Sequence, residues 1–256
     1  MDVAGKAALI TGGGTGTGRA VALELARRGC DVAVNYSRSR ADAEQTATDA
    51  RALGVRALSV QADVADDGAV RAMLAKVGAT FGRLDFLVTS AGQTAFVNHA
   101  DLEGLTEEMW DRILGVNLKG TFYCIRAAAS WLRKDGGGAV CNVSSTAGVY
   151  AVGSSIAYCA SKAAINNMTV SLARALAPDI RVNSVAPGFI DTRWWKDFPA
   201  YEGIKQMVTA QTPLGKVCQP EDVALDIVHL LTADLITGQV LVIDGGHGIA
   251  HGLPRL

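Results

Sequence analysis

The stretch "TGGGTGTG" (residues 11–18) stands between a short apolar run, "KAALIT" (6–11), and a segment with helical spacing, 17–28. Glycine lets a backbone turn tightly and lets a phosphate approach it closely. The start of the next helix would add free N–H groups and a positive dipole end. The spacing Gly12-x3-Gly16-x-Gly18 differs from GxGxxG, and no P-loop Lys-Ser/Thr pair follows. We interpret the stretch as a dinucleotide phosphate loop, with a ligand-free glycine turn as the alternative.

Apolar runs alternate with helical stretches along the rest of the chain. Near-continuous apolar strands alternating with helices indicate a parallel sheet covered on both faces, and right-handed crossovers then give a doubly wound order. The sequence predicts an α/β fold, one Rossmann-like domain over residues 1–256 with about seven parallel strands and helices on both faces. We expect strands at 6–11, 31–36, 55–64, 84–92, 138–145, 180–188 and 239–246, and helices near 17–28, 40–53, 66–80, 106–133, 155–177 and 220–232.

The composition narrows the class of partner. The 256 residues carry a formal net charge of −1, so no basic field exists to hold nucleic acid or an anionic membrane. The uncharged run 136–161 is long enough to span a bilayer, but its Gly, Ser and Asn would make a poor lipid-facing helix. We therefore expect a small-molecule substrate, with no nucleic-acid or membrane partner.

Cysteine and histidine usage points away from disulfides and metals. The five cysteines are an odd number without a CxxC pair, and the four histidines form no HxxxH or HExxH pattern. We expect no metal site and no structural disulfide, which fits a reducing cytosol. We also expect no cleaved leader, because "MDVAGKAALITGG" runs straight into the first strand. The sequence thus predicts a cytoplasmic protein.

The end of the second expected strand bears on the choice of cofactor. An acid there would bond the ribose 2′-hydroxyl of NAD. The chain instead reads Asn35-Tyr36-Ser37-Arg38-Ser39, with two hydroxyls flanking an arginine. Arg38 could clamp a 2′-phosphate through charge-assisted hydrogen bonds, or it could be a solvated residue at a helix entry. We favour NADP(H), with NAD(H) still possible.

A second stretch, "YCASK" (158–162), carries candidate chemistry. Tyr158 and Lys162 are four residues apart, so they share one face of a helix. They could be ordinary surface residues, or a proton donor tuned by a fixed charge. Ser145 ends the fifth expected strand, at the edge where open α/β sheets bind ligands. Asn117, in "GVNLKG", is a poor helix former on an apolar face and would cost stability unless it is hydrogen-bonded.

These stretches, with "DV" at 63–64, "SAG" at 90–92, "NVSS", "VAPGFIDT" and "ITGQVLVIDGG", occur in the order typical of short-chain dehydrogenases/reductases. The resemblance covers essentially the whole chain. It is strongest to NADPH-dependent ketoreductases of the beta-ketoacyl carrier-protein reductase type, and extends to glucose and sugar-alcohol dehydrogenases. One departure is Thr89-Ser90-Ala91-Gly92, where the family usually has Asn-Asn-Ala-Gly. We expect this to alter the support of the central strand without abolishing activity.

The resemblance implies a role for each candidate. Tyr158 would be the general acid in carbonyl reduction and the base in alcohol oxidation, with Lys162 favouring the phenolate and holding the nicotinamide ribose. Ser145 would donate to the substrate oxygen, and Asn117 would hold a water that links Lys162 to solvent. The cofactor site would comprise Gly12, Thr15, Gly16, Thr17, Gly18, Tyr36, Ser37, Arg38, Ser39, Asp63, Val64, Ser90, Ala91, Gly92, Tyr158, Lys162, Pro187, Gly188, Ile190 and Thr192.

Substrate choice and assembly stay more open. We expect specificity to reside in 93–104 and in a substrate lid at about 189–218, where Trp194, Trp195, Phe198 and Tyr201 either cover a substrate or pack the lid onto the body. The resemblance implies a homotetramer built on the long helices and the C-terminal strand. Two alternatives to a ketoreductase remain: a sugar or polyol dehydrogenase, and a non-catalytic cofactor-binding scaffold.

Overall fold

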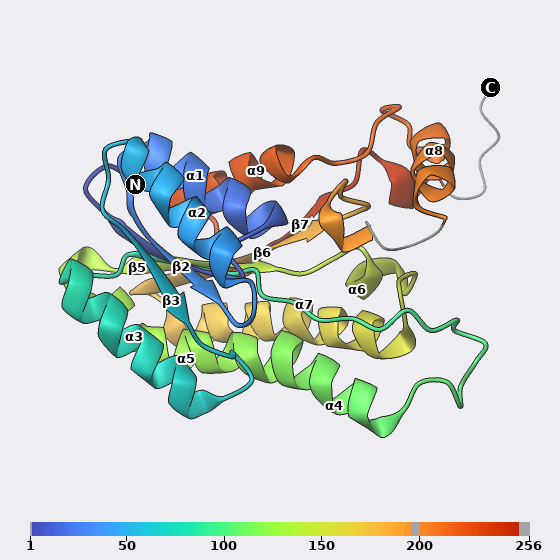
Figure 1. The fold of residues 1–256 in the computed structure, drawn as a ribbon, viewed down its shortest axis with the longest axis horizontal. Coiled ribbons are helices and arrows are strands. Elements are labelled where there is room, and N and C mark those ends of the chain that lie inside the picture. The colour runs from blue at the N-terminus through green and yellow to red at the C-terminus, as the bar shows by residue number, and fades with distance from the viewer. Residues whose placement is uncertain (1, 196–199, 251–256) are drawn as a thin grey trace.

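The computed structural model describes residues 2–195 and 200–250 of the chain. Its centre is a seven-stranded sheet in the order β3-β2-β1-β4-β5-β6-β7, in which every neighbouring pair is parallel (Figure 1). This confirms the predicted doubly wound fold. The chain order reverses between β1 and β4, so a crevice opens there at the carboxyl ends of the strands. The strands are β1 (Ala7–Thr11), β2 (Asp31–Tyr36), β3 (Ala57–Gln61), β4 (Phe86–Thr89), β5 (Gly138–Val143), β6 (Ile180–Pro187) and β7 (Val240–Ile243).

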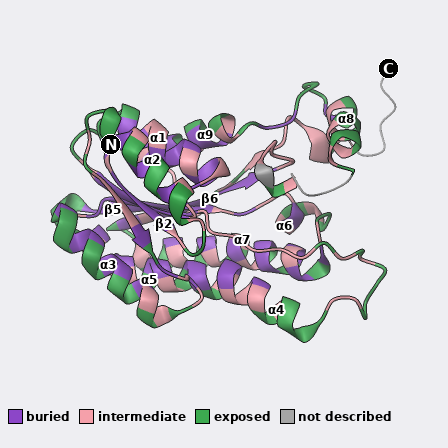
Figure 2. Cartoon of the chain, viewed as in Figure 1, coloured by how far each residue is buried: buried purple, intermediate pink, exposed green. Residues whose placement is uncertain are grey.

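Helices cover both faces of the sheet (Figure 1). One layer holds α1 (Gly16–Arg27), α2 (Arg40–Ala52) and α9 (Pro220–Thr232), and the other holds α3 (Asp67–Phe81), α5 (Thr121–Leu132) and α7 (Ile156–Leu176). In β1, Ala8 and Ile10 join the core under the first layer, whereas Ala7 and Leu9 join the core under the second. Because successive side chains of a strand point to opposite faces, this one strand contributes to both cores. Figure 2 shows the buried residues gathered on the sheet and on the inner sides of the helices.

Local sequence signals set the starts of several helices. Ser155 precedes α7, and its Oγ accepts a hydrogen bond from the backbone N–H of Tyr158. Asp66 caps α3 in the same way through Ala69. Pro220 opens α9, where its missing N–H would have had no helical partner. The cap at Ser155 fixes the register of α7, and with it the face on which Tyr158 lies.

The expected helix over 106–133 is interrupted. It consists of α4 (Glu107–Leu114), a π-helical turn at Gly115–Gly120, and α5. The π-turn contains Asn117, which is fully buried. A π-helical turn holds an extra residue, which apolar periodicity does not register, and such turns are frequent at functional sites.

Two further helices correct the expected segment pattern. The stretch 189–218, in which no helix was expected, contains α8 (Tyr201–Gln211), and a short α6 (Ala147–Tyr150) follows β5. The apolar face of α8 is short: Tyr201, Ile204 and Val208 lie on it at helical spacing and are only half-buried. Most of the expected strands are also too long at their ends: β4 stops at Thr89 rather than at 92. The residues past each strand form the loops that line the crevice.

The central strand is supported by side chains at the departure from the family pattern. Thr89 Oγ1 donates a hydrogen bond to Asn142 Oδ1 on β5 at 2.8 Å, and Asn142 Nδ2 donates to Thr169 Oγ1 on α7 at 3.0 Å. All three residues are buried. Thr89 therefore ties β4 to β5 and, through Asn142, to α7.

Three observations concern the expectations about disulfides, metal sites and membrane-spanning segments. All five cysteines are free thiols and buried. Among residues 2–195 and 200–250, no cluster of His, Cys, Asp or Glu could hold a metal ion. Within the same ranges, every helix is too short or too polar to cross a membrane.

Candidate active site

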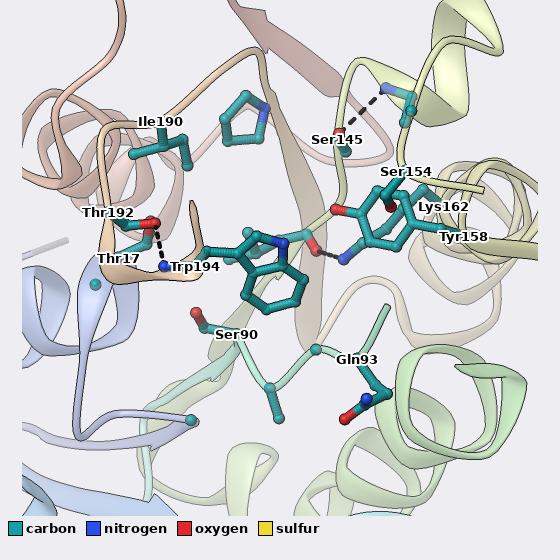
Figure 3. A pocket seen from close by; sticks show the side chains of 18 of the residues that line it. Thr17, Ser90, Gln93, Ser145, Ser154, Tyr158, Lys162, Ile190, Thr192 and Trp194 are labelled. Carbon is teal, nitrogen blue, oxygen red and sulfur yellow. Dashed lines mark hydrogen bonds between the residues drawn. The ribbon is translucent and has the colours of Figure 1, made fainter. Parts of the chain in front are cut away.

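A cleft of about 1420 Å³ lies at the carboxyl ends of the strands (Figure 3). Its walls come from the β1–α1 loop, the ends of β2, β4, β5 and β6, the start of α7 and the segment after β6. This is the place where an open α/β sheet binds its ligand. Of the predicted site residues, all line the cleft except Gly18 and Asn117.

The β1–α1 loop has the form of a phosphate cradle. Gly12 has a φ of +62°, and a Cβ added there would lie 2.9 Å from Cα of Ala91. Gly16 also has positive φ (+50°), and a Cβ there would face only Thr192, at 3.5 Å. Gly18 lies beneath the loop, because a Cβ on it would come 2.4 Å from the carbonyl oxygen of Gly12. The loop is thus open on the cleft side and closed on the sheet side, which fits a bound diphosphate.

Asn35 holds this loop from β2, a role that the sequence did not suggest. Its backbone oxygen accepts from the N–H of Gly13 at 3.0 Å, and its Oδ1 accepts from Gly12 N–H at 3.4 Å. Its Nδ2 donates to the carbonyls of Val60 and Ala62 at the end of β3. Asn35 is buried, so each of these bonds replaces a contact with water.

The far end of the cleft carries charge. Arg38 and Ser37 are exposed at the end of β2, opposite Asp63 in the loop after β3. Asp63 accepts hydrogen bonds from Arg112 Nη1 at 2.8 Å and from Ala65 N–H at 3.0 Å. Burial would raise the pKa of Asp63, but these two bonds outweigh it and the pKa lies below the ordinary value. Asp63 is therefore an ionised acceptor at neutral pH, held by an arginine of α4 that the sequence analysis did not single out.

Tyr158 and Lys162 both face the cleft from α7 (Figure 3). Lys162 Nζ donates to the carbonyl oxygen of Val143 at 2.7 Å and lies 5.5 Å from the centre of the Tyr158 ring. Burial raises the pKa of Tyr158 to about 12, against a smaller lowering effect of Ser145. Burial lowers the pKa of Lys162 to about 8. In the cofactor-free protein, desolvation therefore dominates the pKa of the phenol, and the ammonium of Lys162 is directed at Val143.

Asn117 acts behind the cleft wall. Its Oδ1 accepts from Gln93 N–H at 2.8 Å, and its Nδ2 donates to Gln93 O at 3.0 Å and to Ser161 Oγ at 2.9 Å. Ser161 Oγ in turn donates to the carbonyl oxygen of Tyr158 at 2.7 Å. The buried amide thereby joins the loop after β4 to the helix that carries the tyrosine. These hydrogen bonds satisfy the buried amide of Asn117, which would otherwise cost stability on an apolar helix face.

Two serines at the end of β5 have different roles. Ser144 is buried, and its Oγ donates to the carbonyl oxygen of Lys162 at 3.1 Å. Ser145 lines the cleft, and its Oγ accepts from Ala147 N–H at 3.1 Å. That bond uses the oxygen of Ser145 as acceptor, so its hydroxyl proton is left for the phenol of Tyr158, whose pKa Ser145 lowers, or for a substrate oxygen.

The aromatic residues after β6 divide into two groups. The Trp195 ring stacks on Phe189 at 4.9 Å and tilts against Phe96 at 5.4 Å, and Phe189 also stacks with Tyr201. These contacts pack the lid onto the body, which is the second of the two roles expected for its aromatic residues. Trp194 instead projects into the cleft (Figure 3). Phe198 lies outside the described residues.

Comparison with known proteins places the chain in a family. The family model described as Enoyl-(Acyl carrier protein) reductase matches residues 12–248. A ketoacyl reductase assigned to the granaticin polyketide synthase of Streptomyces violaceoruber is 43% identical over 93% of this chain and 94% of its own length. The 3-oxoacyl-acyl-carrier-protein reductase FabG of Staphylococcus aureus is 38% identical over 94% of this chain and 97% of its own.

Two further matches extend the picture. L-rhamnose 1-dehydrogenase (NAD(P)(+)) of a Sphingomonas species is 39% identical over 94% of this chain and 96% of its own length. The crystal structure of a protein assigned to the short-chain dehydrogenases/reductases of Burkholderia xenovorans superposes with a TM-score of 0.90 at 35% identity, covering 95% of this chain and 98% of that one.

The chain belongs to the short-chain dehydrogenases/reductases. It is an oxidoreductase of the ketoreductase type, acting with a nicotinamide cofactor on a carbonyl and alcohol pair.

Proposed function

We propose that this enzyme uses NADP(H) in preference to NAD(H) and reduces a ketone to a secondary alcohol. The observation that carries the proposal is that Tyr158, Ser145 and Lys162 line the same cleft as the phosphate loop and Arg38. Dinucleotide and carbonyl would thus share one enclosed space. A scaffold that only binds cofactor would have no use for these three side chains at the end opposite Arg38.

The chemistry of the carbonyl falls to the side chains of β5 and α7. When bound, the nicotinamide would supply or accept the hydride. Tyr158 Oη would give its proton to the carbonyl oxygen, and Ser145 Oγ would donate a hydrogen bond to the same oxygen. A phenol with a pKa of about 12 stays protonated at neutral pH, which suits a proton donor for reduction.

Lys162 and Asn117 would prepare the site rather than take part in bond changes. Lys162 has one of its three N–H bonds on Val143, so two remain for ribose hydroxyls. Asn117 fixes Gln93 and, through Ser161, the backbone at Tyr158. Both would therefore govern the placement of cofactor and phenol.

The preference for NADP(H) rests on the end of β2. Position 35 carries an amide that is already committed to the phosphate loop and β3, so no acid is present to bond a ribose 2′-hydroxyl. Arg38 and Ser37 are exposed at the cleft instead, where a 2′-phosphate could accept from both.

The substrate end favours an apolar ketone. Besides Tyr158 and Ser145, its walls include the apolar or aromatic residues Phe96, Val97, Val152, Phe189, Trp195 and Val208. A sugar needs many hydrogen-bond partners, and an apolar wall leaves its hydroxyls unpaired. Two observations support the alternative of a sugar dehydrogenase. One relative is a rhamnose dehydrogenase, and the polar residues Asn98, His99 and Ser154 line the same part of the cleft.

We also propose a cytoplasmic homotetramer. Apolar side chains are exposed on the elements expected to form the interfaces: Met109 on α4, Phe122 on α5, Val170 on α7 and Leu241 on β7. Exposed apolar residues gathered on neighbouring elements mark association surfaces. The five unpaired thiols fit a reducing compartment.

The test is a panel of ketones, secondary alcohols and sugars assayed with NADPH, NADH and their oxidised forms by nicotinamide absorbance. We expect ketone reduction to be fastest with NADPH. Faster oxidation of a sugar than reduction of any ketone would favour the sugar dehydrogenase. Protection by NADPH against thermal unfolding without turnover on any substrate would favour the scaffold.

A further inference from the structure

Trp194 has an unusual position for a residue of a substrate lid. Its ring atom Cη2 lies 3.8 Å from the point where a Cβ on Gly92 would stand. Its backbone N–H donates to Thr192 Oγ1 at 3.4 Å, and Thr192 itself faces Gly16 of the phosphate loop. The segment 192–194 therefore crosses the cleft from the phosphate loop to the end of β4. Figure 3 shows the indole in the middle of the cleft, with Thr192 on one side and Tyr158 and Lys162 on the other.

This indole lies in the part of the cleft that holds Tyr158 and Lys162, and the resemblance assigns Lys162 to the nicotinamide ribose. In Figure 3 Ser90 lies below the indole, Thr192 on one side and Lys162 on the other, and Gly92 approaches the ring from the end of β4. An indole and a pyridine ring are both flat and aromatic, and they cannot fill one space together. The adenosine end is lined by Arg38 and Asp63, which follow β2 and β3.

We infer that Trp194 competes with the nicotinamide ring for one position in the cleft, so that the indole must leave before a whole cofactor can seat. The inference rests on the proposed function, because it needs a nicotinamide cofactor. It makes Trp194 a determinant of cofactor affinity: the binding-competent state is the one with the indole displaced, and apparent affinity falls with the fraction of molecules in that state.

Trp194 can leave more readily than its neighbour. The residue is 43% exposed and lines the open cleft. Trp195 is held between Phe189 and Phe96. The substitution Trp194→Ala would therefore remove the competing ring and leave the aromatic packing of the lid in place.

The test compares two ligands on two proteins by isothermal titration calorimetry. NADPH needs the nicotinamide position, whereas adenosine 2′,5′-bisphosphate needs only the adenosine end. We expect Trp194→Ala to bind NADPH about tenfold more tightly than the wild type and adenosine 2′,5′-bisphosphate equally well. Trp194→Phe, with a smaller ring, should fall between the two. Equal binding of the bisphosphate also shows that each variant is folded at the cleft.

Other outcomes separate the inference from the proposed function. NADPH binding that is unchanged or weakened in Trp194→Ala would overturn the inference alone; weakening would mean that the indole stacks on the bound ring. The inference is also overturned if both the wild type and Trp194→Ala bind NADPH no more tightly than adenosine 2′,5′-bisphosphate. Failure of both proteins to bind either ligand would sink the proposed function and the inference together.

Discussion

Lys162 Nζ donates a 2.7 Å hydrogen bond to the carbonyl oxygen of Val143, the last residue of β5, while the phenol of Tyr158 lies to its side. Lys162 as a whole residue is 5% exposed. The fold therefore keeps a buried ammonium at the end of a strand. The carbonyl of Val143 accepts from only one of the three N–H donors of this ammonium. Such a group costs stability in the empty protein and is retained for what it binds.

The first prediction follows from that cost. Lowering the ammonium pKa from 10.5 to about 8 corresponds to roughly 3 kcal/mol of unfavourable burial at neutral pH, and the bond to Val143 offsets about 1 kcal/mol. Replacing Lys162 by Met should thus stabilise the cofactor-free protein by about 2 kcal/mol while weakening cofactor binding. Chemical denaturation of both proteins measures the difference.

The pH dependence of this gain has a definite sign. Between pH 8 and 10.5 the unfolded chain binds more protons at Lys162 than the folded protein, so wild-type stability rises with pH. The advantage of Lys162→Met should be full below pH 8 and shrink toward pH 10. A variant that is less stable than the wild type at pH 7 would refute the account of Lys162.

Sequence alone predicted the fold because it rests on local, repeated signals. Apolar runs, glycine breaks and helical spacing are all visible in the chain, and parallel strands bring distant loops to one edge. Asn35 and Arg112 were missed as contributors for the opposite reason. Their roles depend on neighbours 23 and 49 residues away in the chain, Gly12 for Asn35 and Asp63 for Arg112. Nothing at those positions distinguishes them from ordinary polar residues.

The pKa of Tyr158 in the cofactor-free protein could not be predicted from the sequence for a related reason. Helical spacing correctly places Lys162 one turn away, but spacing reveals neither the desolvation of the phenol nor the direction of the ammonium. Whether a charge or burial controls a pKa depends on the walls of the cleft, which come from other elements.

The second prediction concerns the titration of Tyr158. Difference spectra between the wild type and Tyr158→Phe should show no tyrosinate from this residue until about pH 12 in the cofactor-free protein. Adding oxidised cofactor should move the transition downward, since a positive ring next to the phenol favours the phenolate. A transition below pH 10 without cofactor would show that Lys162 already controls the phenol.

The third prediction concerns cofactor choice. Arg38→Ala should raise the Michaelis constant for NADPH about ten- to a hundredfold, the value of one lost charge-assisted hydrogen bond, and leave that for NADH nearly unchanged. Arg40→Ala is the matched control, because Arg40 is paired with Glu44 on the exposed side of α2. Equal losses with both cofactors in Arg38→Ala would remove the basis for the NADP(H) preference.

The fourth prediction separates stability from function. Asp85 is 2% exposed and bound by Arg83, Lys6 and the N–H of Ala7, at the start of β4 and away from the cleft. Asp85→Asn should lower stability by about 3 kcal/mol near neutral pH, because it leaves cations without their partner, and should not change NADPH affinity.

The same residue has a pH signature at the acid end of the scale, whereas that of Lys162 lies at the alkaline end. Burial would raise the pKa of Asp85, but the bonds from Arg83 and Ala7 lower it below the ordinary value. Its stabilisation is therefore present above about pH 4, the unfolded pKa, and is lost as pH falls through the folded pKa. Wild type and Asp85→Asn should converge in acid; a gap that stays constant down to pH 2 would contradict the assignment.

The most direct test of the central claim is the turnover of Tyr158→Phe with NADPH and the best ketone of the panel, measured beside the dissociation constant for NADPH. The substitution removes the proton donor and leaves the ring, so we predict a fall in kcat of about 10²- to 10⁴-fold with an NADPH dissociation constant within about twofold of the wild type. Ketone reduction at the wild-type rate by Tyr158→Phe would contradict the claim that this phenol supplies the proton.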